Sequence, residues 1–190
     1  MDKIKVDVIE KYEANRMTMA VLPYKYGKNV MAQVLECENE FIVKRRPMEV
    51  IDRSCRYYGS SYEGRKDGTR ELMGITHKPP IVVDPVSTIF LFPTTSSSRP
   101  QCAWLSHIYI QHYTSTDLDD TKVIFTTGKE ITLPVSVSSF ENQLFRTAQL
   151  RTIISSRVEE EHRKMNMLLL PREKETNSLY EHIIRELSKK

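Results

Sequence analysis

Residues 59–66 read GSSYEGRK, and their two glycines have the spacing of a loop that binds the phosphates of a nucleotide. In such a loop, backbone N–H groups surround one phosphate and a lysine reaches the terminal one. Here Arg65 stands where the lysine belongs, Lys66 replaces the Ser or Thr that binds magnesium, and no buried strand precedes Gly59. These departures argue against nucleotide hydrolysis.

The longer segment around this loop, residues 52–70, is better suited to the backbone of a nucleic acid. Its glycines let the chain approach a sugar–phosphate closely, and its tyrosines can lie against sugars or pack beneath arginines. Its basic side chains are Arg53, Arg56, Arg65, Lys66 and Arg70. The alternative is an ordinary solvated loop in which Asp52 and Asp67 balance the charge, because basic clusters are frequent and weakly specific.

The three cysteines and five histidines of the chain show no spacing that would bring them together. A thiol–imidazole pair for nucleophilic catalysis would need Cys55 beside a histidine, and nothing places one there. His107 and His112 lie five apart in a strand-like segment and would point to opposite faces, so they could share a metal only across a bulge. Without a C-x-x-C pair, we expect no metal site, no disulfide framework, no cofactor and no enzymatic activity.

The net charge of +3 is modest but unevenly distributed. Residues 41–80 contain nine basic and five acidic side chains, an excess that exceeds the net charge of the whole chain. Clustered charge attracts polyanions through its local potential, so this region is expected to face phosphates. The composition, 39% hydrophobic and 28% charged, indicates a globular protein, and no apolar run approaches the ~20 residues of a membrane span. We therefore expect a cytoplasmic protein that does not contact membranes.

The first two-thirds of the sequence is typical of β-strands. Short runs rich in β-branched residues, separated by turn-forming or charged residues, favour an antiparallel meander over residues 18–22, 30–35 and 40–43. A helical turn is expected at residues 47–52, and further strands at residues 81–83, 88–92 and 104–113. A hairpin over residues 122–133 is the clearest element, because Gly128 can supply the positive φ of its turn.

The hydrophobic period changes after Pro134. Ser138 and Glu141 have the spacing of a capping box, in which two side chains satisfy free N–H groups at a helix start. One face of a helix of roughly 20 or more residues would then carry Phe140, Leu144, Ala148, Ile154 and Val158. A final helix is expected to begin near Ser178. Between the helices, residues 167–171 (MLLLP) are typical of an exposed linear motif.

These elements predict an α+β fold with an antiparallel, β-rich N-terminal part followed by a long helix and a C-terminal helix. The length of 190 residues suits one main domain. We expect a β-rich DNA-binding region at residues 1–136, a long helix packed on it at residues 137–164, and a regulatory motif and helix at residues 165–190.

Several blocks of the sequence are long and unusual in composition. They are residues 52–69 (DRSCRYYGSSYEGRKDGT), 77–85 (HKPPIVVDP), 89–94 (IFLFPT), 98–102 (SRPQC) followed by Trp104, Ser106 and His107, and 139–152 (SFENQLFRTAQLRT). These blocks resemble the ComK family of competence transcription factors of Bacillus-type bacteria. The similarity runs from about Tyr12 to Leu187 and so covers nearly the whole chain.

The resemblance implies a cytoplasmic, nucleoid-associated activator that binds AT-rich paired boxes in promoters of DNA-uptake genes. It also implies dimers that pair into tetramers on double-stranded DNA, reading of the minor groove, and an indirect effect on RNA polymerase. Narrow A-tract minor grooves attract arginine, which agrees with the basic segment. The DNA-contacting residues that we expect are Arg53, Arg56, Tyr62, Arg65, Lys66, Arg70, Lys78, Arg99 and Gln101, with Tyr62 as packing support.

The family is further controlled by an adaptor, MecA, which delivers it to the Clp protease by gripping an apolar–proline motif. The matching residues here are Met167, Leu168, Leu169, Leu170 and Pro171, and the aromatic side chains of the family pattern are absent from them. A second, shorter resemblance concerns residues 122–136 followed by a helix, which are similar to the closing hairpin and helix of LytTR-type DNA-binding domains. This second resemblance is what implies that Arg99 and Gln101, in a loop before a strand, join the DNA face. An interaction adaptor that does not bind specific DNA is the alternative function.

Overall fold

The computed structural model describes residues 6–169, 184–185 and 188, and the chain divides into two compact units, residues 1–153 and 154–190, each considered by itself. In the first unit the strands are β1 (Asp7–Ile9), β2 (Thr18–Tyr26), β3 (Asn29–Glu36), β4 (Glu40–Val43), β5 (Ile81–Asp84), β6 (Ile89–Pro93), β7 (Trp104–Ser106), β8 (Ile110–Ser115), β9 (Thr121–Phe125) and β10 (Glu130–Leu133). The helices are α1 (Pro47–Tyr57), α2 (Tyr62–Met73) and the 3-10 turn η1 (His107–Tyr109), and α3 (Val137–Leu169) runs on into the second unit.

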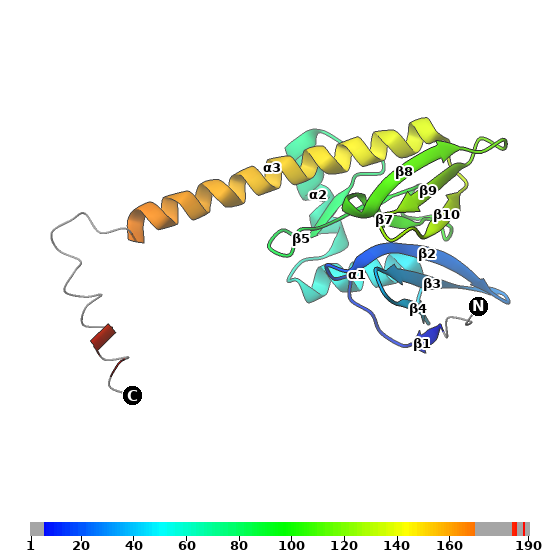
Figure 1. The fold of residues 1–190 in the computed structure, drawn as a ribbon, viewed down its shortest axis with the longest axis horizontal. Coiled ribbons are helices and arrows are strands. Elements are labelled where there is room, and N and C mark those ends of the chain that lie inside the picture. Colours follow the sequence, from blue (N-terminus) through cyan, green and yellow to red (C-terminus); the bar gives the residue numbers. More distant parts are fainter. Residues whose placement is uncertain (1–5, 170–183, 186–187, 189–190) are drawn as a thin grey trace. The chain divides into compact units, whose positions relative to one another are not determined.

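The strands form a seven-stranded sheet in the order β1-β4-β3-β2-β7-β6-β5 and a three-stranded sheet in the order β10-β9-β8 (Figure 1). All neighbours are antiparallel except β1 and β4. The predicted meander of residues 18–43 and the predicted hairpin of β9 and β10 are both present, and Gly128 has a φ of 80° in the hairpin turn. Together with the long helix that follows, these sheets confirm the α+β class.

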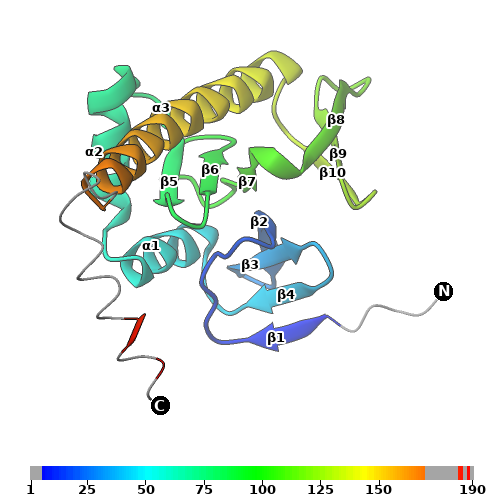
Figure 2. The same ribbon diagram turned by 60° about the vertical axis from the view of Figure 1, so that its left-hand side comes forward.

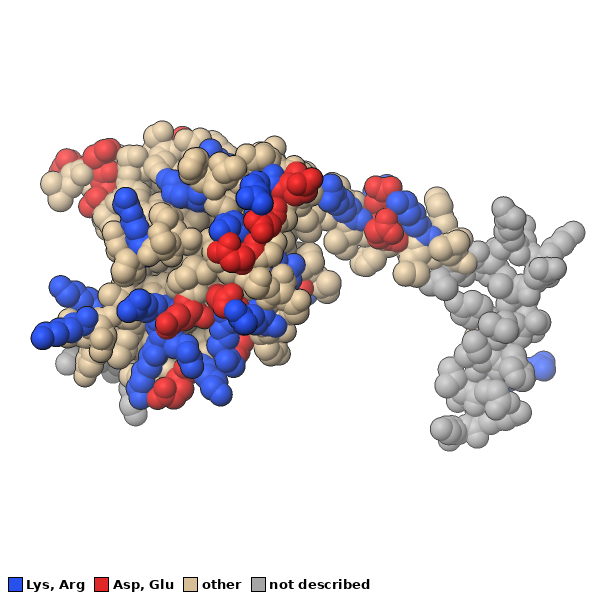
Figure 3. Space-filling model, turned by 180° about the vertical axis from the view of Figure 1, so that it is seen from behind, with Lys and Arg blue, Asp and Glu red and all other residues tan. Residues whose placement is uncertain are grey.

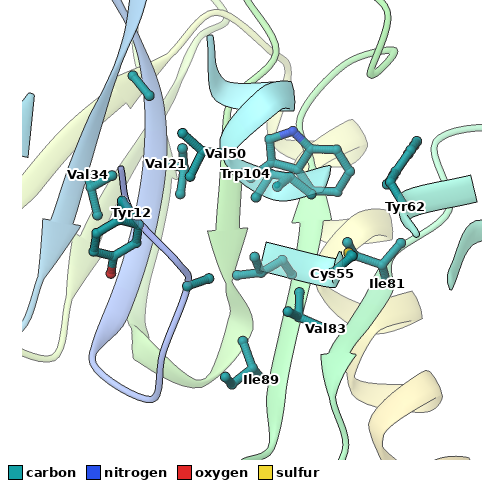
Figure 4. Packing of buried hydrophobic residues seen from close by; sticks show 14 of the residues in the cluster. Tyr12, Val21, Val34, Val50, Cys55, Tyr62, Ile81, Val83, Ile89 and Trp104 are labelled. Atoms are coloured by element: carbon teal, nitrogen blue, oxygen red, sulfur yellow. The ribbon is translucent and has the colours of Figure 1, made fainter. Parts of the chain in front are cut away.

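The middle of the large sheet has a hydrophobic core against each face, which explains the nearly continuous apolar runs of its central strands. Successive residues of one strand point to opposite faces. Val21 and Trp104 therefore belong to the core beneath α1 and α2, whereas Ala20 and Leu105, their chain neighbours, belong to the core shared with the small sheet and the start of α3. Figure 4 shows the first of these cores, in which the ring of Tyr62 meets Trp104 edge-on at a centroid distance of 5.6 Å.

The segment expected to be a turn-rich loop is instead almost entirely helical. The helical turn expected at residues 47–52 extends to Tyr57 as α1, and α2 begins after a tight turn in which Gly59 has a φ of 76°. The Ser61 side chain caps α2 by accepting a hydrogen bond from the Gly64 N–H at 3.1 Å. Gly74, with a φ of 69°, ends the helix in the left-handed conformation. Caps at both ends and the buried Tyr62 and Thr69 thus outweigh two helical glycines, each unfavourable by about 1 kcal/mol.

The strand expected over residues 104–113 is interrupted. The chain pairs with the large sheet as β7, turns through η1 and then pairs with the small sheet as β8. His107 and His112 therefore do not share a strand, and the prediction that they occupy opposite faces of one strand was wrong.

Helix α3 begins at the residue predicted for it, but its cap and part of its buried face differ from the prediction. It starts at Val137, where the Ser136 hydroxyl accepts a hydrogen bond from the Ser139 N–H at 3.4 Å, so Ser138 is not the cap. Ala148 is exposed, contrary to the prediction. The buried side chains of the first unit's part of α3 are Phe140, Gln143, Thr147 and Leu150. Phe140 of the predicted stripe is buried and Leu144 packs against the core, but the prediction missed Gln143 because it considered apolar residues alone. The Gln143 amide donates to the carbonyls of Lys78 and Pro93, both at 2.8 Å, and so belongs in the core.

Candidate nucleic-acid interface

The exposed face of α1 carries two of the predicted DNA-contacting arginines, and both are ion-paired. Arg53 lies 2.6 Å from Glu13, and Arg56 lies 2.7 Å from Asp52 one helical turn earlier. Although burial works to raise it, the pKa of Asp52 is lowered by hydrogen bonds from the Arg56 side chain and the Tyr62 backbone N–H. The carboxylate therefore remains charged and fixes Arg56 beside the start of α2.

The exposed face of α2 repeats this arrangement. Lys66 pairs with Glu63, and Arg70 lies 3.2 Å from Asp67. The Lys66 ammonium also stands 5.7 Å from the centre of the Tyr62 ring. In Figure 3 acidic and basic side chains accordingly alternate over this face of the molecule. Because exposed pairs stabilise a protein by only about 0–1 kcal/mol, a phosphate could replace these carboxylates at small cost.

Three further predicted contact residues have side chains that pack or form hydrogen bonds within the protein. Tyr62 is 5% exposed and packs on Trp104, in line with its expected supporting role. The Arg65 guanidinium is half-buried and donates to the Tyr58 carbonyl at 3.3 Å. The Lys78 ammonium donates to the Ser139 hydroxyl of α3 at 3.0 Å, so it ties two elements together.

A second cluster of cations lies beside the N-terminus of α1, and the sequence reasoning did not include most of it. One groove is lined by Lys28, Asn29, Val30, Met31, Lys44, Arg45, Arg46, Glu49 and Pro100. An adjoining hollow is lined by Arg46, Pro47, Met48, Glu49, Ser97, Ser98, Arg99 and Pro100. The two share Arg46, Glu49 and Pro100, and we refer to them together as the basic groove.

Most cations of the basic groove are unpaired. Lys28, Arg45, Arg46 and Arg99 are all exposed, and none forms a salt bridge with any residue in the described part of the chain. Lys44 is the exception, with its ammonium 2.6 Å from Glu10. That hydrogen bond raises the pKa of Lys44 and lowers the pKa of Glu10, to which Arg45 also contributes. The groove therefore carries more cations without a described carboxylate partner than the ion-paired faces of α1 and α2.

Strand pairing brings these cations together from three distant parts of the chain. The turn before β3 carries Lys28, and the pairing of Ala32 with Val43 sets the start of β3 beside the end of β4. Arg45 and Arg46 follow β4 directly and lead into α1. Arg99 and the exposed Gln101, both predicted contacts, lie in the loop between β6 and β7. The run of three basic residues at positions 44–46 was the one local signal for this site.

The predicted adaptor motif lies at the end of α3, in the second unit. Met167 is 76% exposed and Leu168 is 83% exposed. The structure gives no side-chain surroundings for Leu169, and Leu170, Pro171 and the start of the expected final helix near Ser178 lie outside the described residues. Within the described part of the chain, the side chains that could bind a metal ion form no cluster of three, and no helix is long and apolar enough to cross a membrane.

Comparison with known proteins gives two matches along most of the chain. The family model described as ComK protein matches residues 9–159. A competence transcription factor of Bacillus subtilis (strain 168) is 46% identical over 185 residues, which cover 96% of this chain and 95% of that protein. No solved structure matches the chain, and the likeness of the hairpin and helix to LytTR-type domains is not confirmed.

Proposed function

The chain belongs to the ComK family, and from this premise we propose that it is a transcriptional activator of competence genes that binds double-stranded DNA through the basic groove. The groove is the main contact surface, and the ion-paired faces of α1 and α2 adjoin it as secondary contacts. The protein acts without catalytic activity.

The unpaired cations of the basic groove are the observation that carries this proposal. Arg45, Arg46 and Arg99 each present a guanidinium to solvent, and phosphate oxygens accept hydrogen bonds from such groups in the fork geometry that guanidinium favours. A duplex that neutralises these charges also releases its condensed counterions, which supplies affinity without any base contact.

The resemblance supports finer features of the proposal. The target is a pair of AT-rich boxes read mainly in the minor groove, bound by dimers that pair into tetramers. Degradation by the Clp protease, through an adaptor that grips residues 167–171, regulates the protein, and the exposure of Met167 and Leu168 supports that role. Deleting residues 167–171 should lengthen the half-life of the protein in cells. An unaltered half-life would contradict this regulatory role.

The alternative function is an interaction adaptor for which the basic groove is incidental. The exposed apolar side chains of the second unit favour it, since Met165, Met167 and Leu168 are all more than half exposed. An adaptor of this kind would show only weak, non-specific attraction to DNA.

Fluorescence anisotropy with labelled duplexes separates the two functions. We expect the chain to bind a duplex with two AT-rich boxes at least about tenfold more tightly than a GC-rich duplex of equal length at physiological salt, because specific contacts add to the charge attraction. Equal, weak and fully salt-suppressed binding of both duplexes would favour the adaptor instead.

A further inference from the structure

The β2–β3 hairpin extends beyond the strands on either side of it. The two strands pair with each other as far as Tyr26 and Asn29, whereas β7 pairs only with Ala20 and Val21 of β2, and β4 begins its pairing at Ala32 of β3. Among the described residues no further strand pairs with residues 22–31, so these form a two-stranded ribbon, and its tip lies at the right of Figure 1 (see also Figure 2). We call this segment the ribbon.

Local features agree with a ribbon that stands free of the sheet. Pro23 lacks the N–H that a central strand needs, and it lies where β2 has a neighbour on one side only. Gly27, with a φ of 59°, supplies the positive φ required at the first position of the two-residue turn. The tip is thus specified by its own turn and does not depend on packing.

The side chains of the ribbon suit a polyanionic partner with stacked bases. Tyr24 and Tyr26 share one face and are 38% and 63% exposed, so both rings are accessible to a partner even though Met31 lies opposite Tyr24. Lys25 lies between them on the opposite face of the ribbon and Lys28 lies in the turn, and no described carboxylate pairs with either lysine. Asn29 is exposed directly opposite Tyr26.

The ribbon is continuous with the basic groove, since Lys28, Asn29, Val30 and Met31 form one wall of it. A duplex whose phosphates contact Arg45, Arg46 and Arg99 would therefore have the ribbon beside one of its grooves. Two-stranded ribbons are among the elements that enter DNA grooves and contact base edges.

Resting on the proposed function, we propose that the ribbon inserts its tip into a groove of the bound duplex and supplies much of the sequence preference, with Tyr26 and Asn29 as the base-contacting residues. The arginines of the basic groove, in contrast, contact phosphates and supply affinity for any sequence. Lys25 and Lys28 hold the ribbon against the phosphates on either side of the groove.

Two sets of variants of the full chain test this division of roles. In the double variant Tyr26→Ala with Asn29→Ala, we expect the ratio of affinities for AT-rich and GC-rich duplexes to fall at least about tenfold. Because no charge is removed, the slope of log Kobs against log salt should stay the same. In Lys25→Ala with Lys28→Ala, the slope should fall by up to about 2 while most of the ratio remains.

Leu118→Ala is the matched control, because Leu118 is 83% exposed in the loop between β8 and β9 and lies in another hairpin. Its ratio and slope should equal those of the wild type, and circular dichroism should show the same thermal transition for all four proteins. If the wild type discriminates between the duplexes and the Tyr26→Ala/Asn29→Ala variant discriminates equally well, the role of the ribbon is overturned and the proposed function stands. If the wild type binds neither duplex, the proposed function falls, and the ribbon's role falls with it.

Discussion

Replacing both Arg45 and Arg46 by alanine is expected to weaken binding of AT-rich and GC-rich duplexes alike, by roughly 150-fold or more. Each side chain is exposed, lines the basic groove and has no described carboxylate partner, so each is available for a charge-assisted hydrogen bond worth about 1.5–3 kcal/mol. Anisotropy titrations at several salt concentrations should also give a slope of log Kobs against log salt that is shallower by about 2. The ratio between the two duplexes should change little, because phosphate contacts carry no sequence information.

The matched control for this double variant is Lys122→Ala with Arg163→Ala, which removes the same charge elsewhere. Lys122 pairs with Glu130 on the small sheet, 2.7 Å away, and Arg163 lies in the second unit. The control should keep nearly all of its affinity. Equal losses in both double variants would mean that net charge, and not the basic groove, governs binding.

Replacing Trp104 by alanine is expected to destabilise the first unit by about 3–5 kcal/mol. Trp104 is fully buried between the large sheet and the two helices, and its ring contacts that of Tyr62. A loss of this size is a large share of the 5–15 kcal/mol that holds a typical domain folded. Urea unfolding should be followed by circular dichroism, since Trp104 is the single tryptophan of the chain and its fluorescence disappears with it.

Trp104→Phe keeps the test informative if the alanine variant does not fold. The indole N–H has no hydrogen-bond partner among the residues that the structure describes, so phenylalanine removes an unsatisfied donor as well as part of the ring. It should therefore cost clearly less than alanine. A Trp104→Ala protein as stable as the wild type would show that this side chain does not fill the core as described.

The elements that were predicted correctly are those whose signal is local. The hairpin of β9 and β10 is encoded by alternating β-branched residues around Gly128, and the start of the meander by short apolar runs. The segment after α1 was misjudged because Gly64 and Gly68 lower the helix propensity of α2. Its helical state depends on the Ser61 cap and on the burial of Tyr62 and Thr69 against the sheet, which propensity does not include.

The basic groove could not be predicted for a different reason. Lys28, Arg46 and Arg99 are far apart in the sequence, and only the register of β3 against β4 and the loop after β6 bring them to one place. The predicted DNA contacts came mainly from residues 52–70 instead, because basic side chains are dense in that part of the sequence. The helical spacing of that segment places acidic residues beside its basic ones, so Arg56 and Arg70 are already paired with Asp52 and Asp67.

Lysine acetylation measured by mass spectrometry, with and without an AT-rich duplex, tests most directly where this protein contacts DNA. The account predicts that DNA slows acetylation of Lys25, Lys28 and Lys44, which lie in or next to the basic groove, and leaves Lys122 and Lys164 unchanged. Protection of Lys66 on α2 without protection of Lys28 and Lys44 would contradict it and place the interface on the ion-paired helices.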